Sequence, residues 1–239
     1  MRLLLASAII LSSAALTALA LSGPAHAETR KYELAGFKKI EAHAGYRIEF
    51  TQAPTYSVVV DSKNNNFDLI LIEKVGDTLR IKRPQNTRDT RNVRDVEDVI
   101  RISAPDLDEL ELNAAIDFSA QKLTLDKLRI DADAAIKINI ADLRVDVLDV
   151  EMDAASKMTV AGTCAKLVLD LGSASSVDTK NLKCREVDID AGVASKVHAF
   201  ASERAVARAG ISSSVLISGK PRDFQKSTDR FASTVSLAD

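Results

Sequence analysis

The sequence has no tryptophan, only two cysteines, five prolines and nine glycines among 239 residues, and aromatic residues make up 4% of it. Two cysteines are too few for a four-thiolate zinc site or a multi-disulfide framework. The formal net charge is only −2, from 32 basic and 34 acidic residues. This balance creates no overall field that would favour nucleic acid or an anionic membrane. A hydrophobic content of 46% with 28% charged residues excludes general disorder and predicts a folded, soluble protein.

The first 27 residues have the layout of a secretory signal peptide. Arg2 precedes an apolar stretch over residues 3–21, and residues 25–27 read Ala-His-Ala, a small-residue cleavage motif. A membrane anchor is the alternative, but the many Ala and Ser residues favour cleavage after Ala27. No later apolar stretch is long enough to cross a bilayer. We therefore expect an extracytoplasmic mature chain without stable membrane insertion, in the periplasm, at the cell surface or secreted from a bacterium.

A small-residue segment recurs through the second half of the chain. Copies begin at residues 113, 133, 153, 172, 192 and 210, with a degraded seventh copy at residue 230. The fourth residues of successive copies are 20, 20, 19, 20, 18 and 20 residues apart. Before each copy, apolar and charged residues alternate, as in residues 128–132, which is typical of a strand with one buried face. So steady a period indicates a stacked repeat.

The repeat predicts an all-β protein, namely a single-stranded parallel β-helix, or β-solenoid, with about 20 residues per coil. Each coil would contain a strand, a tight corner, a second strand and a loop, and equivalent strands would stack in parallel at about 4.8 Å. Parallel crossovers favour a right-handed winding. A leucine-rich repeat has a similar period, but its Leu and Asn framework is missing. We expect one domain over residues 28–239, with irregular N-terminal coils at 28–109 and regular repeats at 110–239.

The first position of each copy suggests how the backbone turns at the corner. Only residue types that tolerate a positive φ occupy it. These residues are Asn113, Asp133, Asp153, Gly172, Gly192 and Gly210. We therefore predict that this position is left-handed in every coil. A column of small residues, two positions later, fits a sharp fold in the wall. It contains Ala115, Ala135, Ala155, Ala174, Ala194, Ser212 and Ala232.

The two cysteines occupy equivalent positions in neighbouring coils. Cys164 lies three residues before Leu167, and Cys184 lies three residues before Val187. Stacked coils would bring the two Cα atoms to about 4.8 Å, within the range of a disulfide. In an oxidising compartment we expect a structural disulfide between them, with a pair of free thiols as the alternative.

The N-terminal third lacks the repeat but contains strand patterns. They cover residues 46–50, 56–60, 67–75, 78–82 and 99–103, with a turn at Gly76 and Asp77. The polar segment 84–98 carries Arg88, Arg91 and Arg94. We interpret it as a solvated loop, with a binding element as the alternative.

These features together resemble the head GIN domain of putative auto-transporter adhesins. The resemblance extends over nearly the whole mature chain, and it is carried by residues 37–40, 45–48, 58–60, 76–81, 102–107, 172–175 and 192–195. Family members have a Gly-Ala-Ser motif in most coils, whereas the first three copies here begin with Asn or Asp and two have Ile in place of Ser. The resemblance implies a secreted or envelope β-helix without an established catalytic role. A shared fold alone does not transfer function.

The sequence shows little that points to catalysis. His43 and His198 have no second metal ligand nearby in sequence, so we interpret them as structural. The serines lack a nucleophile elbow or an activating base. Phosphate-binding loops and calcium-binding nonapeptides are also missing. We therefore expect no cofactor, no metal site and no enzyme activity.

One acidic residue per coil precedes each corner by two positions. These residues, called the acidic ladder below, are Glu111, Asp131, Glu151, Asp170 and Asp190. Stacked outward at about 4.8 Å, they would repel one another, and they could bind a cation or a basic partner. Lys137, Lys157 and Lys196 could relieve part of the repulsion. The plainer interpretation is an exposed strand face that stays soluble and resists edge association.

Two classes of function follow. The favoured one is a non-catalytic module that presents a long β-wall to an envelope protein or a glycan. The alternative is a polysaccharide lyase or hydrolase, since parallel β-helices host such enzymes, but no tryptophan platform for sugars is present. An ice-binding wall is less consistent with the sequence, because Lys and Asp interrupt the outward Ser and Thr positions. Exposed sheet edges at both ends lead us to expect capping or a homodimer.

Overall fold

Strands make up nearly all regular structure in the computed structural model, which describes residues 28–62, 65, 67–84, 98–229 and 231–238. The predicted signal peptide and most of the arginine-containing segment, residues 85–97, lie outside these ranges. The N-terminal elements are β1 (Glu28–Tyr32), β2 (Lys39–His43), β3 (Arg47–Gln52), β4 (Ser57–Ser62), the 3-10 helix η1 (Phe67–Leu69), β5 (Leu71–Val75), β6 (Thr78–Lys82), β7 (Val99–Ala104) and β8 (Glu109–Asn113). The later elements are β9 (Asp117–Ala134), β10 (Lys137–Ala154), β11 (Lys157–Ser173), β12 (Ser176–Val193), β13 (Lys196–Ala209), β14 (Ser214–Ser218), β15 (Asp223–Thr228) and β16 (Thr234–Leu237).

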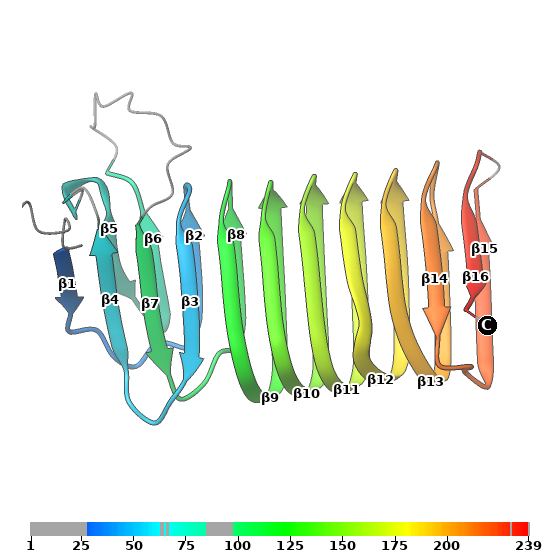
Figure 1. Cartoon of the computed structure of the whole chain (residues 1–239), viewed down its shortest axis with the longest axis horizontal. Helices are drawn as coiled ribbons and strands as arrows, with labels where there is room; N and C mark the ends of the chain where they lie inside the picture. The colour runs from blue at the N-terminus through cyan, green and yellow to red at the C-terminus, as the bar shows by residue number, and fades with distance from the viewer. Residues whose placement is uncertain (1–27, 63–64, 66, 85–97, 230, 239) are drawn as a thin grey trace, which may run out of the picture.

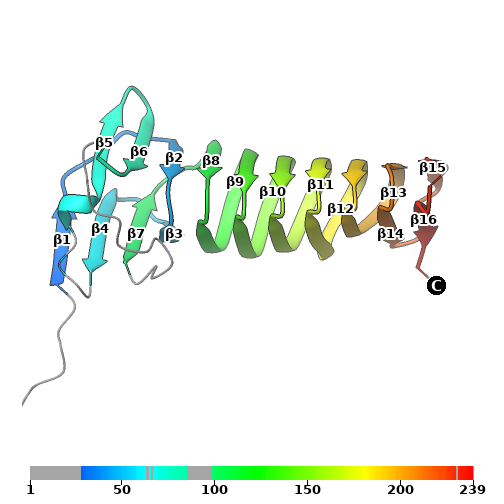
Figure 2. The ribbon, with the colours of Figure 1, turned by 90° about the horizontal axis from the view of Figure 1, so that it is seen from above.

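The long strands β9 to β13 wind beside one another along the long axis of the molecule (Figure 1). Neighbouring windings pair in parallel, so that Lys137 lies between Asp117 and Lys157. From Lys157 the column continues through Ser176, Lys196, Ser214 and Thr234. Each of these residues follows the previous member of the column by 19, 20, 18 and 20 residues, respectively. The view from above shows the chain advancing by one winding at a time (Figure 2). The predicted β-solenoid of about 20 residues per turn is therefore confirmed, with about six turns.

Apolar and polar residues alternate along each strand. The apolar side chains therefore point into the stack and form buried columns, while the polar side chains point outward. Ile130, Val150 and Leu169 pair with one another and are at most 1% exposed. Each such buried side chain contributes about 1.5–3 kcal/mol relative to an exposed one. A single winding has too few neighbours to bury its own column, so each winding is stabilised by the windings on either side.

The N-terminal strands extend the stack but are not all parallel. β2 lies in parallel between β6 and β8, and β3 lies in parallel between β7 and β9. The β1–β4, β4–β7 and β5–β6 pairs are antiparallel. Residues Phe67–Leu69, which the sequence analysis assigned to a strand, form η1 instead. This end of the stack therefore departs from a purely parallel β-helix.

The corner is left-handed at a different position from the one predicted. None of the first residues of the copies has a positive φ among the described residues. This correction applies to Asn113, Asp133, Asp153, Gly172, Gly192 and Gly210. The small residues two positions later adopt the left-handed conformation, with φ between 51° and 58°; they are Ala115, Ala135, Ala155, Ala174, Ala194, Ser212 and Ala232.

Close approach of two windings explains the glycine at the first position of the later copies. A Cβ added to Gly192 would lie 2.2 Å from the carbonyl oxygen of Gly172 and 2.5 Å from that of Leu171. Glycine is selected there because it has no side chain, while alanine tolerates the left-handed turn at a modest energetic penalty. Both demands favour small residues, which is why the sequence pattern alone assigned them wrongly.

Serines at the fourth position of the later copies face inward at the corner. Ser156, Ser175, Ser195 and Ser213 are each 1% exposed. The Ser175 hydroxyl donates to the carbonyl oxygen of Asp153 at 2.8 Å, and the Ser213 hydroxyl accepts from the backbone N–H of Ser195 at 3.0 Å. These bonds satisfy backbone groups that the corner removes from the sheet.

Replacing Ala155 with glycine is expected to stabilise the protein by about 0.5–1 kcal/mol in free energy of unfolding, although Ala→Gly normally destabilises. At φ 53° the alanine Cβ is strained, and glycine removes that strain. Ala154→Gly is the matched control at the end of β10, where glycine should destabilise by about 0.5–1 kcal/mol. Urea denaturation followed by circular dichroism measures both. Equal losses in the two variants would contradict the assigned conformation.

The predicted disulfide is present. Cys164 on β11 pairs with Cys184 on β12, and the two Cα atoms are 4.5 Å apart. The bridge therefore joins two adjacent windings of the stack.

The last winding carries exposed polar residues where earlier windings carry buried apolar ones. β15 places Lys226 and Thr228 opposite Ala207 and Ala209, which are buried in β13. A terminal winding whose outer face is polar is what a stacked repeat needs at its end. Part of the expected capping is thus built from the chain itself.

Candidate binding surfaces

The acidic ladder stacks in register on the outer face of the windings. Glu111 pairs with Asp131, Asp131 with Glu151, and the order continues through Asp170 and Asp190. The structure extends this column at both ends. Glu41 of β2 lies beside Glu111, and Arg208 of β13 lies beside Asp190. Six carboxylates, from Glu41 to Asp190, therefore stand in one column, and Arg208 follows Asp190 in the same column.

Cations near this column come from other positions than those the sequence suggested. Arg129 lies 2.9 Å from Glu151 and 3.9 Å from Asp131. Arg80 lies 2.7 Å from Glu41. Lys137 instead pairs with Asp117 at 3.5 Å. Among the described residues, neither Lys137 nor the other two lysines of its series, Lys157 and Lys196, forms an ion pair with the acidic ladder, and the ion pairs of the ladder and of Glu41 with arginine or lysine come from Arg129 and Arg80 instead.

The carboxylates of the ladder disfavour one another's ionisation. Partial burial, followed by the charges of Glu151 and Glu111, raises the pKa of Asp131 above its ordinary value, while Arg129 acts in the opposite direction. Burial, followed by the charges of Asp190, Glu151 and Asp153, raises the pKa of Asp170. No cation is among the causes acting on Asp170. Repulsion between stacked carboxylates thus raises both pKa values, and Arg129 opposes it only at Asp131.

The Asp170→Asn variant is expected to be more stable than wild type at pH 7 by about 0.5 kcal/mol, a typical value for relieving like charges across a strand pair. A raised pKa means that ionisation of Asp170 destabilises the folded state. This penalty begins as the pH rises through the aspartate pKa of the unfolded chain, about 3.9, and it is complete above the raised pKa of Asp170 in the folded state. The gain should therefore vanish below about pH 4, where aspartate is protonated. Thermal denaturation from pH 3 to 8 measures it.

Asp188→Asn is the matched control for this experiment, because Asp188 lies 3.5 Å from Arg208 and has an opposite charge nearby. It should give no gain at pH 7. A stabilisation of equal size in both variants would show that repulsion within the acidic ladder is not the cause.

The ladder does not converge into a metal site. Within the ranges that the structure describes, no group of three or more His, Cys, Asp or Glu side chains could hold a metal ion. His43 lies 2.9 Å from a carboxylate oxygen of Glu41, and His198 lies 2.8 Å from the hydroxyl of Ser218. Within the described part of the chain, each of these two imidazole rings forms one side-chain hydrogen bond.

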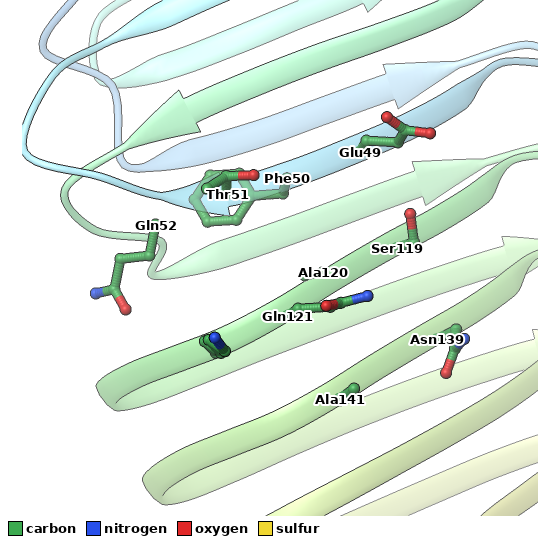
Figure 3. A pocket seen from close by; sticks show the side chains of 10 residues that line it. Glu49, Phe50, Thr51, Gln52, Ser119, Ala120, Gln121, Asn139 and Ala141 are labelled. Atoms are coloured by element: carbon green, nitrogen blue, oxygen red, sulfur yellow. The ribbon is translucent and has the colours of Figure 1, made fainter.

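A second surface feature, which the sequence analysis missed, is a hollow of about 580 Å³ where the N-terminal strands meet the regular windings. It crosses β3, β9 and β10, and we call it the junction groove (Figure 3). Two outward columns line it, which consist of Glu49, Ser119 and Asn139, and of Thr51, Gln121 and Ala141. Gln52 and Lys122 line its end where the strands bend.

The bend at the end of the groove is held by hydrogen bonds between separate segments. The Gln52 amide donates to the carbonyl oxygens of Pro105 and Thr124, at 3.0 and 2.9 Å. Its oxygen accepts from the backbone N–H of Thr124 at 2.8 Å. Lys122 adopts the left-handed conformation, with φ 57°. The backbone of β3 is thereby fixed against β9, and the groove has a defined shape.

No signal in the sequence marked these groove residues. Each of them occupies an outward position of a strand, where polar residues are expected in any β-solenoid. Their grouping depends on which windings pair, and β3 pairs with β9 although the two are separated by more than 60 residues. An alignment by the 20-residue period, which starts at residue 113, does not include β3.

The structure shows no helix, among the residues it describes, that is long and apolar enough to cross a membrane. A comparison with curated proteins found no significant match. Several solved structures share the fold. They include an adhesin described as putative from Bacteroides fragilis, with 21% identity and a TM-score of 0.81 over 88% of this chain and 96% of that one.

Two further similar structures come from Parabacteroides species. One, from Parabacteroides distasonis, is described as a putative lipid binding protein, with 15% identity and a TM-score of 0.67 over 91% of this chain and 98% of that one. The other is a putative adhesin from Parabacteroides merdae, with 13% identity and a TM-score of 0.64 over the same shares. At these identities the likeness shows the fold alone.

A family model provides the stronger assignment. The model described as "putative auto-transporter adhesin, head GIN domain" matches residues 36–221. That range contains β2 to β14 and so includes the acidic ladder, the disulfide and the junction groove. The chain therefore belongs to the head GIN domain family.

Proposed function

We propose that this protein is a non-catalytic, adhesin-type binding module that acts outside the cytoplasm, in the periplasm or at the cell surface of a bacterium. The family and its similar structures, which are described as adhesins or as a lipid binding protein, support a role in binding. The N-terminal pattern of a signal peptide supports export, with cleavage after Ala27. The partner is an envelope protein or a glycan.

The observation that carries this proposal is the stacking of like side chains on the outer wall. Six carboxylates form one column, and polar residues form others at the same rung spacing. The continuous apolar core holds these columns in place. A solenoid surface of this kind can bind an extended partner through many weak contacts along its length.

Affinity capture from bacterial envelope extract tests the binding role. The purified protein, coupled to a resin, should retain an envelope component that excess free protein displaces. Asp131→Ala and Asp170→Ala variants report whether the acidic ladder takes part. A failure to retain any displaceable component would count against the proposal.

Localisation and activity are separate tests. Cell fractionation followed by N-terminal sequencing should find the chain outside the cytoplasm, beginning at Glu28. A screen on acidic polysaccharides should show no turnover. Turnover that Asp131→Ala or Asp170→Ala abolishes would instead support an enzyme.

A further inference from the structure

The junction groove contains polar side chains whose hydrogen-bonding groups are free to meet a ligand. Thr51, Gln121, Lys122 and Asn139 are exposed and make no side-chain hydrogen bond or ion pair within the described part of the chain. Glu49 is held by Arg101 at 3.1 Å, so it is oriented and partly neutralised. The groove therefore combines a fixed frame with unpaired donors and acceptors.

We propose that the junction groove binds a neutral oligosaccharide whose chain runs along the axis of the stack. The inference rests on the proposed binding role of the module and names the class of its ligand. Its direction follows from the lining, because the column of Glu49, Ser119 and Asn139 places a polar side chain on each of three adjacent strands, β3, β9 and β10. A linear ligand laid along the axis meets a polar side chain from each strand in turn.

The chemistry of the lining matches sugar hydroxyls. The amides of Gln121 and Asn139 each donate and accept, as does the hydroxyl of Thr51. The Ser119 hydroxyl donates to the carbonyl oxygen of Ile48 at 3.5 Å and can accept from a ligand. A sugar hydroxyl also donates and accepts, so these groups can satisfy it from either side.

Lys122 and Glu49 are the one cation and the one carboxylate of the lining that the structure describes. Arg101, which pairs with Glu49, also pairs with Asp61, so the four formal charges sum to zero, which favours a neutral ligand over a strongly charged one.

The size of the groove fits a short oligosaccharide. A hollow of about 580 Å³ lies within the range of small-molecule sites. Phe50, the one aromatic residue of the lining, is 3% exposed and offers no ring face for stacking. Binding must therefore depend on hydrogen bonds of modest net strength, and we expect a Kd on the order of 0.1–1 mM.

Titration calorimetry and NMR line broadening test the inference with defined probes. The probes are the neutral tetrasaccharides of glucose, mannose and N-acetylglucosamine, and an acidic tetrasaccharide of galacturonate. At least one neutral probe should bind, and Gln121→Leu and Asn139→Leu should each weaken its binding about tenfold. The galacturonate probe should bind no better than the neutral ones.

Asn181→Leu is the matched control, because Asn181 is an exposed residue of β12 that lies outside the groove lining, and it should leave the affinity unchanged. If no neutral tetrasaccharide binds, or if the two groove variants bind as wild type does, the oligosaccharide site is overturned. The binding role of the module then depends on the envelope capture experiment, which does not require a sugar. Stronger binding of galacturonate than of every neutral probe would overturn the neutral class.

Discussion

The Gly162→Ala protein is expected to lose about 3 kcal/mol or more in free energy of unfolding, among the largest effects of a single methyl group. Gly162 lies on β11 beside Leu143, where the pairing with β10 shifts register. A Cβ at residue 162 would lie 1.9 Å from the carbonyl oxygen of Leu143 and 2.6 Å from its nitrogen. Its φ of 142° is also a conformation that only glycine adopts readily. Accommodating alanine therefore requires two paired windings to separate.

Gly76→Ala is the matched control, because its φ of 63° is also left-handed but a Cβ there would have nothing within 4 Å. It should lose only about 1–2 kcal/mol, from backbone strain alone. Urea and thermal denaturation, followed by circular dichroism, compare the two variants with wild type. If both variants lose the same stability, steric contact with Leu143 is not the reason that glycine is required at residue 162.

Removal of the disulfide by Cys164→Ala with Cys184→Ala is expected to lower the free energy of unfolding by about 3 kcal/mol. The bridge closes a loop with a sequence separation of 20 residues, and it restricts the unfolded chain accordingly. For a chain of this length, the midpoint of thermal unfolding should fall by about 6–12 °C. Scanning calorimetry measures the change.

A reductant provides the internal control for the disulfide. Wild-type protein in a thiol reductant should unfold close to the temperature of the double variant, whereas the double variant itself should not respond. A thiol assay shows whether the reductant has freed the cysteines. If they are free and the midpoint of thermal unfolding of the wild-type protein has not changed, the predicted stabilisation is contradicted.

The regular half of the fold was predictable from the sequence because each residue pairs with one that lies about 20 positions away in the sequence. Apolar residues at every second position identified the buried faces, and the 20-residue spacing identified which residues stack. The same spacing placed Cys164 beside Cys184 and ordered Glu111, Asp131 and Glu151 into one column. Each of these contacts lies one winding apart, so a local pattern was sufficient to predict it.

The conformation at the corner was not predictable in the same way. Two requirements act within three residues of each other, a left-handed turn at Ala194 and a close backbone approach at Gly192. Both select for small residues, so composition alone cannot assign them. The serine that follows, Ser195, adds a third requirement, since its buried N–H needs the hydroxyl of Ser213 in the next winding.

The sequence by itself determined the period, the class of fold, the disulfide and the register of the acidic ladder, because these follow from residues that repeat at a constant offset. Only the tertiary structure decided how the N-terminal strands join the stack. There β3 pairs with β9 across the intervening strands, and β4 and β5 run antiparallel to their partners. The junction groove arises at that join, because the pairing of non-repeating segments leaves no periodic trace in the sequence.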